Sequence, residues 1–304
     1  MNSADSHFPG VIVPLVTPFH DDGSLALEVL PALVEFVLGA GVAGLVVAGT
    51  TGEGYALDMA ERADVLRTVL AVTRGRVPVL AGVGGTATRE AVLQARLAVE
   101  AGVQGLMLAA PAYCLPTGDE LGRHVLAVLR ATELPTVLYD YPARTGVPFD
   151  VTALDLVATD PMIVGIKEAS GDLSRISLLR DRYGDHLSVV CGSDTLAMHY
   201  FEAGSDSWIA GFANALPAEH VAMLAAARRG DMSAGWQMQR RLLPVLTDVE
   251  SGHYVARTRW SLIARGIPVG PPRAPMQPLG ASDGAAMRAH LENAARKTII
   301  DIGH

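Results

Sequence analysis

The chain has 304 residues, of which 50% are hydrophobic and 18% are charged, and its formal net charge is −8. This composition supports a large buried core, excludes extensive disorder and, without a basic cluster, argues against nucleic-acid binding. No apolar stretch reaches the roughly 18 uninterrupted residues that a membrane helix needs.

The remaining composition indicates a soluble cytoplasmic enzyme. Residues 1–7 have neither the basic region nor the apolar core of a signal peptide. The cysteines, Cys114 and Cys191, form no CxxC motif, and the nine histidines lack HExxH spacing, so neither a disulfide framework nor a zinc site is indicated. Walker, GxGxxG and GxSxG motifs are absent as well. We therefore expect no metal and no membrane partner.

Along the chain, short apolar runs alternate with turns rich in Gly or Pro and with amphipathic segments. Eight runs are typical of strands: 10–17, 44–48, 77–82, 105–110, 136–141, 162–169, 187–191 and 207–212. Helices are predicted between them, for example at 88–101 and at 58–74, where Asp58 and Glu61 have capping-box spacing. After residue 215 the pattern predicts only helices, at 217–229, 232–250, 257–265 and 285–295.

Eight strand–helix units match an α/β fold of the (β/α)₈ TIM-barrel type. A doubly wound sheet is the alternative, because alternation alone does not prove closure. We predict a barrel catalytic domain over residues 1–230 and a C-terminal helical extension over residues 231–304. Barrel active sites lie at the C-terminal ends of the strands, so the residues that end each apolar run are the candidates.

Lys167 ends one of these runs. Period-two alternation predicts that its side chain shares a strand face with Gly165 and Ile163. Burial would lower the pKa of the amine, and a neutral amine can attack a carbonyl to form a Schiff base. The alternative is a lysine whose charged end reaches solvent at the end of the strand.

Other strand ends carry polar groups too. Residues 49–54, Gly-Thr-Thr-Gly-Glu-Gly, could bind a carboxylate or phosphate, or form an ordinary turn. Tyr139, on the preceding strand relative to Lys167, could move protons or simply be a core aromatic. Arg144 could bind a substrate carboxylate or be a solvated loop residue. Gly192 and Gly211 are expected to leave room for a ligand.

Several strand-end motifs together resemble those of one family. The motifs are GTTGE at 49–53, YxxPxRTG at 139–146, GIKEASGD at 165–172, GSD at 192–194 and AN at 213–214. They resemble the dihydrodipicolinate synthase / N-acetylneuraminate lyase family of class I, Schiff-base aldolases, over about residues 10–216, and the C-terminal helices resemble that family's appendage. The resemblance implies a lyase without a cofactor that condenses a lysine with pyruvate or a related 2-oxo acid. Carbon–carbon bond cleavage or formation, or elimination of water or ammonia, would follow.

The resemblance also implies roles for individual residues. Lys167 matches the Schiff-base lysine, and Tyr139 matches the tyrosine that relays protons. Thr50 and Thr51 match the pair that holds the substrate carboxylate, with Thr51 also bridging tyrosines. Tyr113 matches a tyrosine that crosses a dimer interface into the neighbouring site.

Two more residues match substrate-binding positions in the family. Arg144 matches an arginine that binds a semialdehyde carboxylate, and Ile209 matches a residue whose backbone carbonyl faces the keto acid. Gly192 is added as a substrate-binding residue only because a glycine at a strand end leaves room for a ligand. The resemblance further implies a homo-oligomer, a dimer or a homotetramer built as a dimer of dimers.

The chain departs from the synthase branch at several positions. Asp140 replaces the usual Asn, Ala112 replaces the first residue of a Tyr-Tyr pair, and residues 252–257 replace an NPxPxK motif. Feedback inhibition by lysine is not expected, because the positions of its polar ligands hold Met59, Arg62, Thr86 and Ala112. These departures favour a paralogue that acts on another 2-oxo acid. A 4-hydroxy-tetrahydrodipicolinate synthase of lysine biosynthesis is the specific alternative, and a non-catalytic 2-oxo-acid-binding barrel is a remote one.

Overall fold

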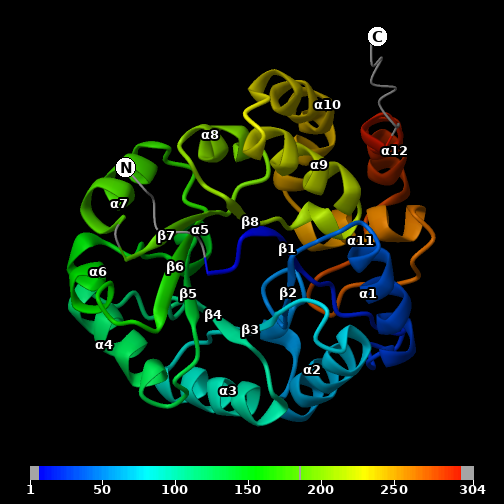
Figure 1. Ribbon diagram of the computed structural model, residues 1–304. Coiled ribbons are helices and arrows are strands. Elements are labelled where there is room, and N and C mark those ends of the chain that lie inside the picture. The colour runs from blue at the N-terminus through cyan, green and yellow to red at the C-terminus, as the bar shows by residue number, and fades with distance from the viewer. Residues whose placement is uncertain (1–6, 185, 296–304) are drawn as a thin grey trace.

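The fold is a closed barrel of eight parallel strands. The computed structural model describes residues 7–184 and 186–295. Each strand pairs with the next along the chain, and β8 pairs with β1, which confirms the TIM barrel and rules out a doubly wound sheet (Figure 1). The strands are β1 Gly10–Pro14, β2 Gly44–Val47, β3 Val79–Val83, β4 Gly105–Ala109, β5 Thr136–Asp140, β6 Ile163–Glu168, β7 Ser188–Cys191 and β8 Ser207–Ile209.

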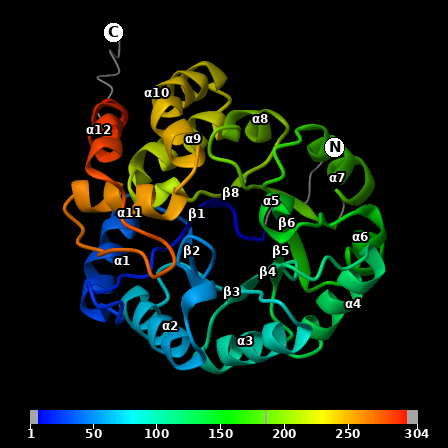
Figure 2. The same cartoon turned by 180° about the vertical axis from the view of Figure 1, so that it is seen from behind.

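Helices surround the ring of strands (Figures 1 and 2). Those of the barrel are α1 Leu30–Leu38, α2 Met59–Thr73, α3 Thr88–Ala101, α4 Gly118–Leu129, α5 Pro142–Thr145, α6 Val151–Val157, α7 Ser174–Tyr183, α8 Ala197–Glu202 and α9 Pro217–Arg228, with short 3₁₀ turns at Leu27–Val29, Gly54–Ala56 and Phe212–Asn214. The predicted capping box opens α2: the Asp58 side chain accepts from the Glu61 backbone at 2.8 Å, and Glu61 accepts from the Asp58 backbone at 3.0 Å.

Side chains of the strands alternate between two separate hydrophobic cores. The outer core fills the layer between strands and helices, and the inner core fills the barrel. The inner core consists of Phe8, Ile12, Val46, Leu80, Met107, Val137, Tyr139, Val190 and Ile209. Most of these residues are aliphatic and almost completely buried, so the barrel is a packed interior rather than a channel.

A register shift in β6 corrects one expectation about Lys167. Thr136 pairs with Ile163, but the next pair is Val137 with Gly165, so one extra residue lies in β6. As a result Ile163 packs in the outer core, whereas Val164 packs against the inner one. The prediction that Ile163 shares a face with Lys167 was wrong, because strict alternation fails across a bulge.

Three helices follow the barrel: α10 Met232–Glu250, α11 Tyr254–Ala264 and α12 Ala281–Ala295. They gather on one side of the ring, where α11 packs against α10 and α12 (Figure 2). Helix α11 begins three residues before its predicted start at 257, which places Tyr254 in its first turn. Residues 296–304 of the predicted extension lie outside the described part of the chain. Residues 1–6, which make up most of the segment that lacks signal-peptide features, lie outside it as well.

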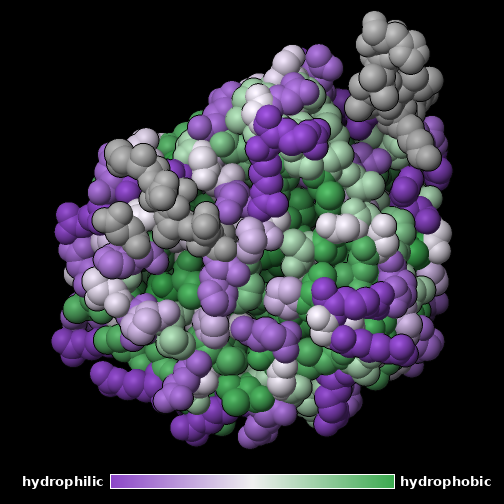
Figure 3. All heavy atoms as spheres, in the orientation of Figure 1, coloured by the Kyte–Doolittle hydropathy of each residue, from purple (hydrophilic) through white to green (hydrophobic). Residues whose placement is uncertain are grey.

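Hydrophilic and hydrophobic side chains are interspersed on the face of the molecule in Figure 3. The hydrophilic ones project around the rim and also cross the middle of this face, with hydrophobic ones between them. None of the helices in residues 7–184 and 186–295 combines the length and the apolarity needed to cross a bilayer.

Candidate active site

Lys167 and Tyr139 lie side by side at the C-terminal ends of β6 and β5. The two residues are direct partners in the strand register, and the Lys167 Nζ lies 4.1 Å from the centroid of the Tyr139 ring. Both side chains are buried, with 6% and 7% exposed. Burial lowers the pKa of Lys167 from 10.5 to about 8, and the negative charge of Asp194 opposes this change. About one molecule in ten then has a neutral amine at pH 7, against one in a few thousand for an ordinary lysine.

Tyr139 stays neutral beside this amine. Burial raises the pKa of its phenol to about 12, while the positive charge of Arg144 and a hydrogen bond from Thr50 act in the opposite direction. A neutral phenol can both donate and accept a proton at physiological pH. Arg144 belongs to the short helix α5, is exposed, and has its Cζ 5.4 Å from the Tyr141 ring centroid.

The two threonines of the loop after β2 contact different tyrosines. Thr50 hydrogen-bonds Tyr139, whereas the Oγ1 of the buried Thr51 lies 3.3 Å from the Oη of Tyr254. Sequence reasoning missed Tyr254 as a site residue, because the segment 252–257 that contains it departs from the family's NPxPxK motif.

Asp194, just after β7, is a second site residue whose role the sequence did not indicate. Its side chain is buried, and its Oδ1 accepts from the Trp208 Nε1 at 3.1 Å and its Oδ2 from the Phe212 backbone at 2.8 Å. Burial raises the pKa of this carboxyl to about 6, which leaves it mostly ionised at pH 7. The site therefore contains a buried anion that interacts with Lys167.

The space beside the glycines after β7 and β8 is filled by other residues of the protein and not left open for a ligand. A Cβ on Gly192 would lie 2.4 Å from the Glu168 carbonyl oxygen, and one on Gly211 would lie 1.8 Å from the Tyr254 Oη. Only the backbone of Gly192 is thus available for the predicted substrate contact. Ile209, at the end of β8, is buried in the inner core near Tyr139.

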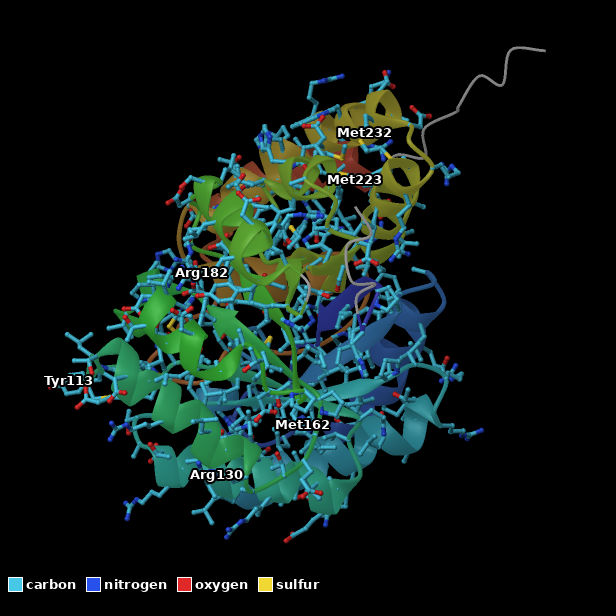
Figure 4. All side chains as sticks on the ribbon, turned by 60° about the vertical axis from the view of Figure 1, so that its left-hand side comes forward. Tyr113, Arg130, Met162, Arg182, Met223 and Met232 are labelled. Atoms are coloured by element: carbon cyan, nitrogen blue, oxygen red, sulfur yellow. The ribbon has the colours of Figure 1, made fainter. Side chains whose placement is uncertain are left out.

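Tyr113 is not brought to Lys167 within one chain. It follows β4 with a backbone φ of +71°, and its side chain is 92% exposed. Figure 4 shows it projecting from the edge of the molecule. Its role in a neighbouring site remains a prediction.

A network on the outer face of β5 and β6 supports the site from behind. Arg175 of α7 forms ion pairs with Asp140 and, at 3.6 Å, with Glu168, whose carboxylates are both fully buried. Glu168 also accepts a hydrogen bond from the Tyr200 hydroxyl. Asp140 and Glu168 directly follow Tyr139 and Lys167 in their strands, so the network fixes both strands where the site residues are. Asp140, the departure from the family's Asn, therefore faces away from the site.

The fold and the lysine at its centre define a class: lyases of the class I, Schiff-base type, built on a TIM barrel. The model of the Dihydrodipicolinate synthetase family matches residues 7–294. The chain belongs to this family.

Individual relatives agree with this assignment. A 4-hydroxy-tetrahydrodipicolinate synthase of Sorangium cellulosum is 37% identical over 292 residues, which is 95% of each chain. The same enzyme from an Exiguobacterium species is 33% identical over 94% of this chain and 97% of its own. Among solved structures, a chloride-inhibited dihydrodipicolinate synthase from Acinetobacter baumannii, complexed with pyruvate, has a TM-score of 0.90 at 31% identity, covering 94% of this chain and 99% of its own.

Proposed function

We propose that Lys167 forms a Schiff base with the 2-carbonyl of pyruvate or a related 2-oxo acid. The observation that carries this proposal is the buried amine, whose pKa is lowered to about 8. The neutral amine attacks the carbonyl, and the protonated imine then withdraws electrons from the adjacent carbon. Tyr139 moves the protons, and the loop with Thr50 and Thr51 binds the substrate carboxylate through its hydroxyls and backbone N–H groups.

Condensation of the pyruvate imine with aspartate semialdehyde is the specific candidate reaction. The relatives named above are 4-hydroxy-tetrahydrodipicolinate synthases, and Arg144 offers a guanidinium near Tyr139 for a second carboxylate. Asp140 no longer argues against this reaction, because its carboxylate pairs with Arg175 on the outer face. Tyr254, in contrast, lies in the site itself, and therefore aldol cleavage or elimination on another 2-oxo acid is the second candidate.

Borohydride reduction in the presence of pyruvate, followed by peptide mass spectrometry, tests the imine. The only lysines in the chain are Lys167 and Lys297. A reduced adduct should appear on the Lys167 peptide, persist in Lys297→Arg and disappear in Lys167→Ala together with turnover. If neither pyruvate nor longer 2-oxo acids gave an adduct on the folded protein, the proposal would fail and a non-catalytic barrel would replace it.

The reaction is tested separately by incubating the enzyme with pyruvate and aspartate semialdehyde. Equal consumption of both substrates supports the synthase. An adduct on Lys167 without consumption of the semialdehyde points to cleavage or elimination instead.

A homo-oligomer in the cytoplasm is part of the proposal. Tyr113, exposed on its loop, would contact a second copy of the chain. One solved neighbour, at 29% identity, is described as a monomeric dihydrodipicolinate synthase variant, so the number of subunits has to be measured for this chain, for example by sedimentation.

A further inference from the structure

Tyr254 lies in the site although it belongs to α11, outside the eight strand–helix units. Its Oη is 3.3 Å from the Oγ1 of Thr51, and either hydroxyl can donate to the other. A hydroxyl proton rotates to suit its partner, so this contact selects an orientation for the Thr51 hydroxyl. The neighbouring Thr50 hydrogen-bonds Tyr139.

Two features hold Tyr254 in this place. Gly211 approaches so closely that any side chain there would collide with the Tyr254 hydroxyl. In addition, Arg259 of the same helix forms a buried ion pair with Glu53, with its Nε 2.7 Å and its Nη2 2.5 Å from the Glu53 Oε1. Glu53 lies two residues after Thr51, so the pair joins α11 to the loop that carries the threonine.

The electrostatic surroundings keep this hydroxyl protonated. Burial raises the pKa of Tyr254, and the negative charge of Asp194 acts in the same direction, whereas the hydrogen bond with Thr51 acts against them. Tyr254 thus shares the electrostatic environment of the site and remains a neutral donor and acceptor at physiological pH.

From these contacts we infer that Tyr254 is a positioning residue that orients the Thr51 hydroxyl for proton transfer at the Lys167 imine, within one chain. The inference rests on the proposed function and adds to it. It differs from the arrangement that the family resemblance implies, in which the second tyrosine is Tyr113 of a neighbouring chain. Tyr254 makes its contact without any neighbour.

Exchange of the pyruvate methyl protons with D₂O, followed by proton NMR, measures the relevant step. A proton leaves the methyl carbon of the imine, and a deuteron from solvent returns to it, so nothing is consumed. Tyr254→Phe should slow this exchange by about tenfold or more, approaching the roughly 10²–10⁴-fold loss of rate that removal of a general acid–base group causes. Borohydride trapping on Lys167 should stay unchanged. Tyr183→Phe is the matched control, because its hydroxyl bonds Asp155 on the outside of the barrel and exchange should not change.

A double-mutant cycle with Thr51→Val separates positioning from general structural damage. If Tyr254 acts through Thr51, the double variant should exchange no more slowly than Thr51→Val alone. Unchanged exchange in Tyr254→Phe, or additive losses in the cycle, would overturn the inference and leave the proposed function intact. Failure of the unmodified protein to form the trapped adduct would instead overturn the proposed function, and the inference with it.

Discussion

Replacing Lys167 by methionine should make the protein more stable at pH 7 while it abolishes turnover. The folded protein lowers the pKa of this amine from 10.5 to about 8. Because one pKa unit corresponds to about 1.4 kcal/mol, the ammonium costs the folded state about 3 kcal/mol at pH 7. This cost is the net of burial and the attraction of Asp194, so removing the lysine charge should recover most of the roughly 3 kcal/mol as stability. Methionine has a similar length and no charge to desolvate.

The stabilisation should depend on pH in a defined direction. The folded-state pKa lies below the unfolded-state value, so the cost is fully present below about pH 8, where both states are protonated. The cost is lost as the pH rises through 10.5, because the lysine is then neutral in both states. The difference in unfolding free energy between variant and parent should therefore shrink between pH 7 and pH 10.

Urea unfolding at these two pH values measures both effects. Arg89→Met, which removes an exposed cation from α3, is the control and should change stability little at either pH. A lower unfolding free energy for Lys167→Met at pH 7 would refute the reasoning. A gain that was equal at pH 7 and pH 10 would also refute it, since the gain would then not come from the charge.

Three further predictions concern the residues around the lysine. Tyr139→Phe should lower kcat by roughly 10²–10⁴, the range for a lost general acid–base, and an unchanged kcat would remove it from proton transfer. Arg144→Ala should raise KM for a second substrate with a carboxylate but leave the pyruvate adduct intact; loss of the adduct would assign Arg144 to the first substrate. Arg175→Met should cost about 3–5 kcal/mol in urea unfolding, because two buried carboxylates lose their cation. Arg182→Met, which breaks an exposed ion pair on the same helix, should cost far less; equal losses would mean that the buried network adds nothing.

The sequence predicted the barrel well because each strand is an apolar run that ends at a turn residue. It also placed Lys167 and Tyr139 on adjacent strands, where the register pairs them. The bulge in β6 could not be predicted in the same way. An extra residue in a run of Val, Ile and Gly leaves the composition unchanged, so nothing in the pattern reveals which side chain turns outward.

Long-range contacts were the other part that the sequence did not reveal. Tyr254 and Thr51 are 203 positions apart, and their meeting depends on how α11 packs against the barrel. The start of α11 was also predicted too late, because residues 252–256 carry no N-terminal cap: His253 precedes the helix with a φ of +50° and no side-chain hydrogen bond. A contact of this kind follows from the packing of two elements and leaves no local pattern.

The ion pairs of Arg175 behind β5 and β6 involve different residues from those that face the site. Successive residues of one strand face opposite ways, so Tyr139 and Lys167, the proposed catalytic residues, line the site while their neighbours Asp140 and Glu168 pair with Arg175 behind it. Selection for a new substrate can therefore change loops and the lining without loosening the two strands that carry the reaction. An engineer who wants to redirect this enzyme should vary the loop residues and leave Arg175 untouched.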